Sequence, residues 1–223
     1  AGYCGSRLIP QLLSRGYKVT VYDILYFGRE FLPLEHPNLT LIEGDIRDSE
    51  LMTRLLADTD ILIHLAALRI RHCIAEPELA FQVMFQAPFD LFRLAAEGAI
   101  ERVITASSSS VYGQADQWPT NERHHSYNDV TLYGVGKLSN EGMLRVLNDT
   151  HGLSFAALRP FNVYGPRMDI HGAYTEVMVR WMQRIAGGQS PIIFGDGKQN
   201  MDFSYVDDVA RAFLLAAGSS RAF

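Results

Sequence analysis

The chain places a tyrosine and a lysine four residues apart, in the segment Tyr133-Gly134-Val135-Gly136-Lys137. If this segment is helical, the phenol and the ammonium group lie one turn apart on the same face. A tyrosine is a poor base near neutral pH, but a neighbouring cation favours its phenolate. The pair could therefore exchange a proton with a substrate hydroxyl while a bound cofactor takes a hydride from the same molecule.

Four consecutive serines supply hydroxyl groups upstream of this pair. Ser107 to Ser110 follow the apolar run Val103 to Ala106 and lead into Val111-Tyr112-Gly113. Parallel sheets bind ligands at the carboxyl ends of their strands, where these hydroxyls would lie. We expect one of the serines to hydrogen-bond the reacting oxygen; the alternative is a flexible serine loop.

A glycine-rich turn stands at the beginning of the chain. Gly2-Tyr3-Cys4-Gly5 is followed by a helical pattern and then by a strand-like run that ends in Asp23. In this layout the glycines let the backbone approach a pyrophosphate, and the helix amides point at its charge. Asp23 would accept both adenosine ribose hydroxyls and repel a 2′-phosphate, which favours NAD over NADP. The alternatives are an ordinary βα turn and a strand-end turn residue.

The elements that must position these residues alternate along the chain. Strand-length apolar runs alternate with amphipathic segments, which is typical of a buried parallel sheet. Pro10 is expected near the first turn of its helix, where a missing N–H is tolerated. The pattern predicts an α/β fold with a doubly wound, Rossmann-like parallel sheet. We expect strands at Lys18–Asp23, Leu39–Glu43, Ile61–Leu65, Val103–Ser107 and Ser154–Leu158, and helices at Ser6–Arg15, Asp48–Ala57, Leu79–Glu97, Leu132–Asn148 and Asp207–Ala217.

The sequence patterns at the two ends of the chain predict the domain organisation. The first residues resemble a turn that should follow a strand, and the last helical pattern stops abruptly. We expect residues 1–160 to form a dinucleotide-binding domain without its first strand. Residues 161–223 are expected to combine the last Rossmann elements with the start of a small, mostly missing C-terminal substrate region.

Composition limits the classes of partner. The chain has 223 residues, 48% of them hydrophobic, and a formal charge of −5, so we expect one large core and neither a nucleic-acid nor a membrane partner. Cys4 and Cys73 lack the paired spacing of a zinc site, and the histidines show no ligand spacing, so no metal is expected. Two cysteines and no targeting signal favour the cytoplasm.

In their order along the chain, these motifs resemble those of the extended short-chain dehydrogenase/reductase family. Within it they resemble the NAD-dependent epimerase/dehydratase group, which includes UDP-glucose 4-epimerase. The resemblance covers essentially the whole chain, and the ordered set of blocks is more specific than any one of them. Those blocks are the glycine turn, Asp23, Gly44–Asp48, His64–Ala67, Ser107–Gly113, Tyr133–Lys137, Leu158–Arg167, and Gly195–Gly197 leading to Asp202–Asp208.

The resemblance implies a role for each matching residue. Tyr133 would be the catalytic acid/base, Lys137 would hold the nicotinamide ribose and lower the tyrosine's pKa, and Ser108 would be their hydroxyl partner. Asn162 would contact the diphosphate of a nucleotide-sugar substrate, and Arg69 could contact a phosphate. The residues implied to bind NAD are Gly2, Tyr3, Cys4 and Gly5 at the pyrophosphate, Asp23 at the adenosine ribose, Asp45 and Ile46 at the adenine, and Leu65, Ala66, Ala67, Tyr133 and Lys137 on the nicotinamide side.

The resemblance also narrows the reaction. The group's 4,6-dehydratases carry an Asp-Glu pair after the serine, and its UDP-glucuronate decarboxylases carry a glutamate there, where this chain has Ser109 and Ser110. It therefore implies a UDP-hexose 4-epimerase that works by transient C4 oxidation, rotation of the 4-keto sugar and hydride return. The alternatives are another nucleotide-sugar dehydratase or reductase of the family, and a non-catalytic NAD-binding homologue.

Two positions depart from the pattern of the group. Met201 stands where many relatives have an arginine that grips the nucleotide diphosphate, so Arg69 or Arg167 would serve, or the nucleotide end is bound differently. Met84 stands where an asparagine is usual. The predicted helices over 79–97 and 132–148 could form the four-helix interface of a homodimer, or could place both apolar faces on the sheet.

Overall fold

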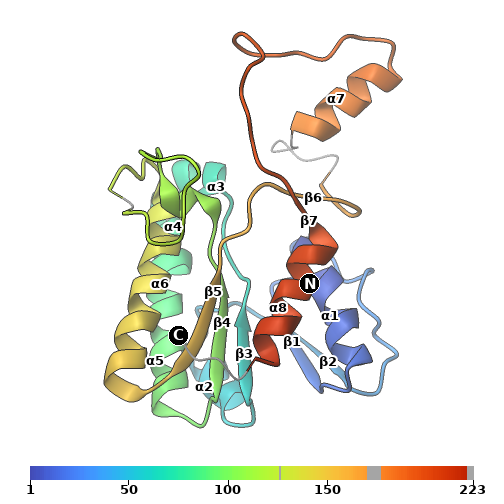
Figure 1. Ribbon diagram of the computed structural model, residues 1–223. Coiled ribbons are helices and arrows are strands. Elements are labelled where there is room, and N and C mark those ends of the chain that lie inside the picture. The colour runs from blue at the N-terminus through green and yellow to red at the C-terminus, as the bar shows by residue number, and fades with distance from the viewer. Residues whose placement is uncertain (126, 170–176, 220–223) are drawn as a thin grey trace.

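The computed structural model describes residues 1–125, 127–169 and 177–219, in which helices flank parallel strands (Figure 1). The predicted α/β class is confirmed. The strands are β1 (Val19–Asp23), β2 (Leu39–Glu43), β3 (Ile61–His64), β4 (Arg102–Ala106), β5 (Ser154–Leu158), β6 (Val163–Tyr164) and β7 (Ser204–Tyr205). The helices are α1 (Tyr3–Ser14), α2 (Ser49–Leu56), α3 (Ile70–Ala75), α4 (Pro77–Phe81), the π-helical η1 (Gln82–Gln86), α5 (Ala87–Glu97), the 3-10 helix η2 (Ser109–Tyr112), α6 (Leu132–His151), α7 (Val177–Ala186) and α8 (Val206–Ala217).

All strand pairs are parallel, and they form three sheets. β1 pairs with β2, β4 lies between β3 and β5, and β6 pairs with β7. Among the described residues no ladder joins β1 to β3, so the single sheet that was predicted is divided at this point. The five predicted strands are each present, with ends within one residue of those observed.

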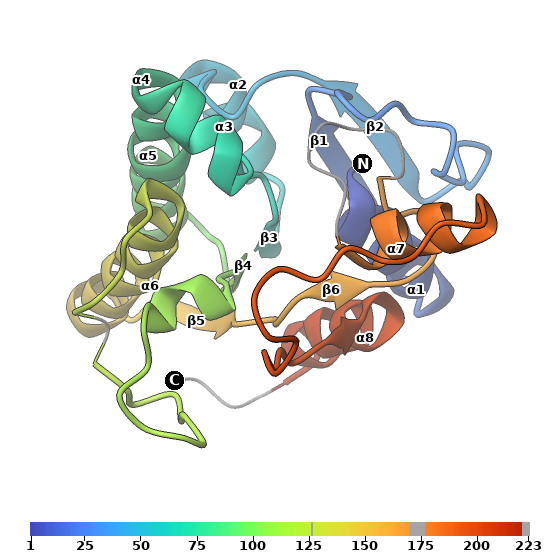
Figure 2. The same ribbon diagram turned by 90° about the horizontal axis from the view of Figure 1, so that it is seen from above.

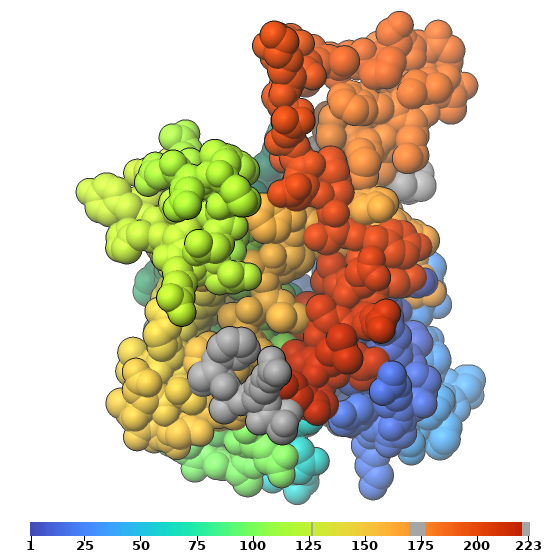
Figure 3. Space-filling model, viewed as in Figure 1, coloured from blue at the N-terminus to red at the C-terminus, as the bar shows by residue number. Residues whose placement is uncertain are grey.

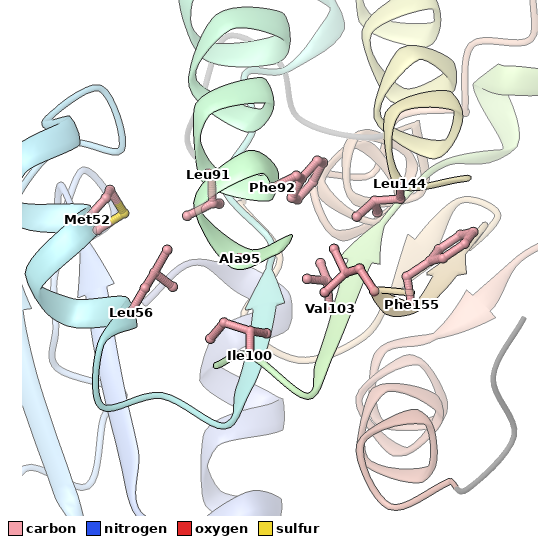
Figure 4. Packing of buried hydrophobic residues seen from close by; sticks show 10 residues of the cluster. Met52, Leu56, Leu91, Phe92, Ala95, Ile100, Val103, Leu144 and Phe155 are labelled. Carbon is pink, nitrogen blue, oxygen red and sulfur yellow. The ribbon is translucent and has the colours of Figure 1, made fainter. Parts of the chain in front are cut away.

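Both faces of the central strand are covered, because successive side chains of a strand point to opposite sides. Val103 of β4 packs with Phe92 of α5 and Leu144 of α6, in the cluster that Figure 4 shows. Its neighbour Ile104 packs with Phe213 of α8 and with residues of α1. Figures 1 and 2 accordingly show α5 and α6 on one side of β3–β5 and α1 and α8 on the other, which confirms the doubly wound arrangement.

Pro10 lies inside α1 and not near its first turn, because the helix begins at Tyr3. The prediction for Pro10 was therefore wrong. A proline has no N–H to offer to the carbonyl four residues earlier, which here belongs to Ser6. Arg167 donates from Nη1 to this carbonyl oxygen at 2.9 Å. A guanidinium from the loop after β6 thus replaces the helical hydrogen bond that Pro10 cannot make.

The predicted single helix over 79–97 is divided into α4, η1 and α5. Pro88 has no N–H for the carbonyl of Met84, four residues earlier. The side-chain amide of Asn140, in the orientation that satisfies both of its ends, donates to that carbonyl at 3.2 Å and to the carbonyl of Gly136 at 3.3 Å. The proline explains the local departure from α-helical bonding, and Asn140 joins the irregular turn to α6.

His64, the last residue of β3, is buried with its ring 5.5 Å from the Phe92 ring. Desolvation, aided by the charge of Lys137, lowers the pKa of His64 to about 3 from an ordinary value of 6.5. The unfolded chain therefore binds a proton near pH 6.5 while the folded protein stays neutral at this position. The stability that neutral His64 confers is present above its unfolded pKa and is lost as the pH falls below it.

We expect the free energy of unfolding to fall by about 2 kcal/mol on this account between about pH 7.5 and about pH 5. Urea denaturation of the parent protein and of His64→Leu at both pH values measures how much the free energy of unfolding of each protein changes with pH. The variant should lose less stability on acidification than the parent. His151→Leu, which removes an exposed histidine, is the control and should behave as the parent does. Equal losses in His64→Leu and the parent would contradict the prediction.

Candidate active site

α6 brings Tyr133 and Lys137 to the carboxyl end of β4. Thr131 caps the helix, since its hydroxyl accepts a hydrogen bond from the Gly134 amide at 3.0 Å. The Lys137 ammonium is buried and donates to the carbonyl of Ala106, the last residue of β4, at 2.6 Å. Its Nζ lies 5.8 Å from the centroid of the Tyr133 ring. The structure therefore brings the two side chains together.

The two glycines between them allow neighbouring segments to approach α6 closely. A Cβ at Gly134 would lie 2.2 Å from Oδ2 of Asp129, and one at Gly136 would lie 2.9 Å from Cβ of Met84. Both distances are shorter than real Cβ contacts. The sequence Tyr-Gly-Val-Gly-Lys thus places the pair against η1 and against the turn that precedes α6.

Ser108 is the member of the serine run that affects the pKa of Tyr133. It caps η2, and its Oγ accepts a hydrogen bond from the Ser110 amide at 3.1 Å. Burial raises the pKa of Tyr133, and a hydrogen bond from Ser108 lowers it in part. Ser107 is buried and its hydroxyl donates instead to Glu141. The hydroxyls of Ser107 and Ser108 therefore have different environments.

Burial decides the protonation of the Tyr-Lys pair in this arrangement. Desolvation lowers the pKa of Lys137 to about 8, against the opposing effects of Cys4 and Cys73. The same effect dominates at Tyr133, whose pKa is raised, and the Lys137 ammonium bonds to a backbone carbonyl. The prediction that Lys137 lowers the pKa of Tyr133 is thus not met here. An oxidised nicotinamide ring beside the phenol would add the positive charge that favours phenolate.

The glycine turn lies at the start of α1, close to the segment that follows β3. Gly2 is the N-cap of α1, no side chain caps the helix, and no acidic residue occupies its first turn. A Cβ at Gly5 would meet Cδ1 of Leu65 at 3.8 Å. Ala66 and Ala67 follow in an exposed stretch without regular structure. The first turn of α1 thus has no carboxylate, and it lies beside the irregular segment that begins at Leu65. Such a helix N-terminus suits the negative charge of a pyrophosphate.

Asp23 ends β1 beside this turn. Its Oδ2 lies 2.6 Å from the amino nitrogen of Ala1, and its Oδ1 accepts from the Leu25 amide at 2.7 Å. Asp23 stands at the carboxyl end of β1, the Leu65 segment at that of β3, and the serines at that of β4. Sheets of this kind bind dinucleotides at the carboxyl ends of their strands. The residues present therefore fit the cofactor.

The two residues predicted to contact adenine follow β2. The Asp45 carboxylate is bonded by Arg47, which holds the pKa of Asp45 below its usual value. The carbonyl of Asp45 accepts the Tyr22 hydroxyl at 2.7 Å. Ile46 packs against the buried cluster that contains Cys73. The Asp45 side chain is thus engaged locally, while Ile46 lies with residues near Tyr133.

The residues predicted to meet the substrate have partners of their own. Asn162 is exposed, has a positive φ of 21°, and donates from Nδ2 to the carbonyl of Asp202 at 2.7 Å. Arg69 forms an ion pair of 3.1 Å with Asp169 and lies 5.1 Å from the Phe27 ring centroid. Arg167, the other candidate to replace an arginine at Met201, is engaged with α1 as described above.

A buried ion pair beside the site was not predicted. Glu141 lies one turn beyond Lys137 on α6 and bonds to Arg159, just after β5. The sequence signal that could have revealed Glu141 was the continued four-residue spacing from Tyr133 through Lys137.

In Figure 3 the surface is hollowed between the segment 113–125 and the segment that carries α7. Within the described residues no group of three or more His, Cys, Asp or Glu side chains could hold a metal ion.

Comparison with known proteins identifies the family. The chain matches the model of the NAD dependent epimerase/dehydratase family over residues 1–222. It belongs to that family. The predicted resemblance is thereby confirmed, and NAD is the cofactor that the glycine turn and Asp23 indicate.

Its relatives within the epimerase/dehydratase family carry several activities. A putative UDP-glucose 4-epimerase of Methanocaldococcus jannaschii is 32% identical over 219 residues, which are 97% of this chain and 70% of that protein. The structure of a UDP-N-acetylglucosamine 4-epimerase from Methanobrevibacter ruminantium M1, in complex with UDP-N-acetylmuramic acid, has a TM-score of 0.92 and 37% identity, covering 99% of this chain and 71% of that one. A UDP-N-acetyl-alpha-D-glucosaminuronate decarboxylase of Bacillus cytotoxicus is 31% identical over 97% of this chain and 68% of that protein.

Proposed function

We propose that the protein is an NAD-dependent 4-epimerase of a UDP-hexose. The observation that carries this proposal is the position of Tyr133 and Lys137 at the end of β4, from which the serines Ser107 to Ser110 follow directly. Tyr133 takes the proton of the C4 hydroxyl, Ser108 holds the same oxygen, and Lys137 binds the nicotinamide ribose. NAD, held by the glycine turn and Asp23, would supply the acceptor for the C4 hydride and would act as the donor of that hydride in the return step.

The environments of Ser109 and Ser110 support epimerisation over elimination or decarboxylation. The Ser109 amide donates to the carbonyl of Pro160 at 3.1 Å, and the Ser110 hydroxyl lies 3.2 Å from that of Ser108. A neutral hydroxyl is a much weaker acid or base near neutral pH than a carboxylic acid or carboxylate, so neither residue replaces the carboxyl groups of the dehydratases and decarboxylases.

The decarboxylase relative makes a second reaction worth testing, because the same oxidation at C4 precedes each outcome. Proton NMR of the protein with NAD and a panel of UDP-, dTDP- and GDP-sugars separates them. The proposal requires one UDP-hexose to reach equilibrium with its C4 epimer. A stable 4-keto-6-deoxy or decarboxylated product would instead assign one of the alternative reactions. An inert panel would favour the non-catalytic homologue.

We propose the domain division expected from the sequence, with residues 1–160 as the NAD-binding domain and 161–223 shared between that domain and a substrate region. The packing of α8 against α1 supports the shared assignment, since Val209 and Phe213 lie in one cluster with Leu8 and Leu12. Arg7 reinforces it with two bonds of 2.5 and 2.7 Å to Asp207.

We also propose that the enzyme works in the cytoplasm. This rests on Cys4 and Cys73, both of which are free thiols, and on the absence of paired spacing between them. Separately, none of the helices in the described ranges has both the length and the apolar character needed to cross a bilayer.

A homodimer through α5 and α6 is the assembly we propose. These helices pack side by side on one flank of the molecule (Figure 1) and leave large apolar side chains exposed. Phe89 on α5 is 48% exposed, and Val146 on α6 is 60% exposed. Such side chains, on two adjacent helices, are suited to the seam of a four-helix interface.

Phe89→Asp should convert the dimer to a monomer, because it places a charge in the apolar seam. Light scattering coupled to size-exclusion chromatography measures the mass. Phe194→Asp is the control, since this side chain is 80% exposed and belongs to the segment between α7 and β7, which Figure 1 shows apart from α5 and α6. A parent protein that elutes as a monomer, or a Phe89→Asp variant that remains a dimer, would contradict the assembly.

A further inference from the structure

Glu141 extends the row of functional side chains on α6. Tyr133, Lys137 and Glu141 are spaced four residues apart, so they share one face of the helix. Only 4% of the Glu141 side chain is exposed. Its Oε1 accepts a hydrogen bond from Nε of Arg159 at 2.8 Å, and its Oε2 accepts one from Nη2 at 2.6 Å. The hydroxyl of Ser107 donates to the same carboxylate.

Arg159 carries this connection to the surface segment beside the site. Its Nη1 donates to the carbonyl of Glu122 at 3.0 Å. Its Cζ lies 4.9 Å from the ring centroid of Tyr112, which in turn stacks on Phe161 at 5.8 Å. One carboxylate therefore ties together α6, the ends of β4 and β5, and the segment 113–125.

A buried ion pair of this kind contributes little net stability, because desolvation of both groups offsets their attraction. The ion pair does fix the position of the Glu141 carboxylate, because two bonds from the guanidinium and one from the serine hydroxyl restrict its orientation. Ser107 is the residue next to Ser108, and its amide is bonded to the carbonyl of Leu158 at 2.8 Å. Glu141 therefore fixes Ser107 against α6, and the backbone of Ser107 leads directly into Ser108.

We propose that Glu141 is a positioning residue that holds the Ser108 hydroxyl against the Tyr133 phenol, acting through Ser107 and Arg159. The inference rests on the proposed role of the Ser108–Tyr133 pair. It adds a residue that touches neither substrate nor cofactor but determines how well the pair is aligned.

The test measures ionisation of Tyr133 directly, by NMR of protein labelled with carbon-13 at the tyrosine Cζ and assigned with Tyr133→Phe. Ser108→Ala removes a bond that lowers the pKa of Tyr133, so this variant should show a raised pKa. Glu141→Gln should raise it in the same direction, although Cys4, Cys73 and Lys137 remain in place. The double variant should show no further rise, since both changes remove one contact.

Kinetics with the UDP-hexose provide the second readout. Glu141→Gln should lower kcat by about 10- to 100-fold through misalignment, with KM changed little. Glu97→Gln is the matched control, because Glu97 also pairs with an arginine on a helix, at 2.8 Å, but is exposed and remote from Tyr133. It should leave both the kinetics and the tyrosine pKa unchanged.

The outcomes separate the inference from the proposed function. If the parent protein turns over no sugar, the proposed function fails, but the NMR titration still tests the alignment. If Glu141→Gln leaves the pKa of Tyr133 unchanged while Ser108→Ala raises it, the inference is overturned. Should Glu141→Gln not fold, Ser107→Ala keeps the ion pair and removes only the link to β4, and an unchanged pKa in that variant overturns it equally.

Discussion

Tyr133→Phe is expected to lower kcat for the sugar by about 10²- to 10⁴-fold, the range for losing a positioned general acid/base. The Tyr133 phenol shares a face of α6 with Lys137, and its pKa is lowered in part by Ser108. A phenylalanine keeps the ring in its place among Cys73 and Met84, so the fold is retained. The loss should therefore appear in the proton-transfer step, with NAD binding preserved.

Single-turnover formation of reduced cofactor, followed by absorbance after mixing with the UDP-hexose, measures the affected step. Tyr17→Phe is a matched control, because this tyrosine follows the C-terminal end of α1, opposite the glycine turn. It should leave turnover unchanged. A Tyr133→Phe variant with more than a tenth of the parent activity would show that another group moves the proton.

The strands and the doubly wound arrangement were predictable because their signals are local. Each strand is a short apolar run. Helices cover both faces of β4, and a strand that is buried on both faces shows no alternation of apolar and polar residues. β6 and β7 were not predicted, since two residues each are too few to carry a pattern. The helix predictions were wrong at Pro10 and across Pro88, where the carbonyls of Ser6 and Met84 lose their helical partners. Arg167 and Asn140, which are far away in the sequence, bond to these carbonyls instead.

The candidate active site was likewise predictable only in part. Spacing alone predicted that Tyr133 and Lys137 share a helix face and that one of the four serines lies near them, because each side chain is placed by a neighbouring strand end or helix turn. The choice of Ser108 among the serines came only from the family resemblance. The protonation of the pair was not predictable, since it depends on burial produced by packing of distant segments, including Cys73. Glu141 was missed for a related reason: its partner Arg159 is 18 residues away on another element.

Phe92→Ala is expected to lower the free energy of unfolding by about 3 to 5 kcal/mol, through lost burial and the cavity that remains. Phe92 is 0% exposed and lies in the cluster of Figure 4 between α5, α6 and β4. Whole domains of this size are stable by only about 5 to 15 kcal/mol, so the variant should sit near the threshold of folding at ordinary temperature.

The Phe92 ring also contacts elements that support the candidate active site. Phe92 meets the His64 ring edge-on and shares its cluster with Leu144 of α6, the helix that carries Tyr133 and Lys137. Urea denaturation monitored by circular dichroism measures the loss, and Phe194→Ala, an identical deletion at a side chain 80% exposed, should fall within about 0.5 kcal/mol of the parent. A loss below about 1 kcal/mol in Phe92→Ala would mean that the cluster closes around the cavity; α6 would then have moved, and turnover should fall even though stability is kept.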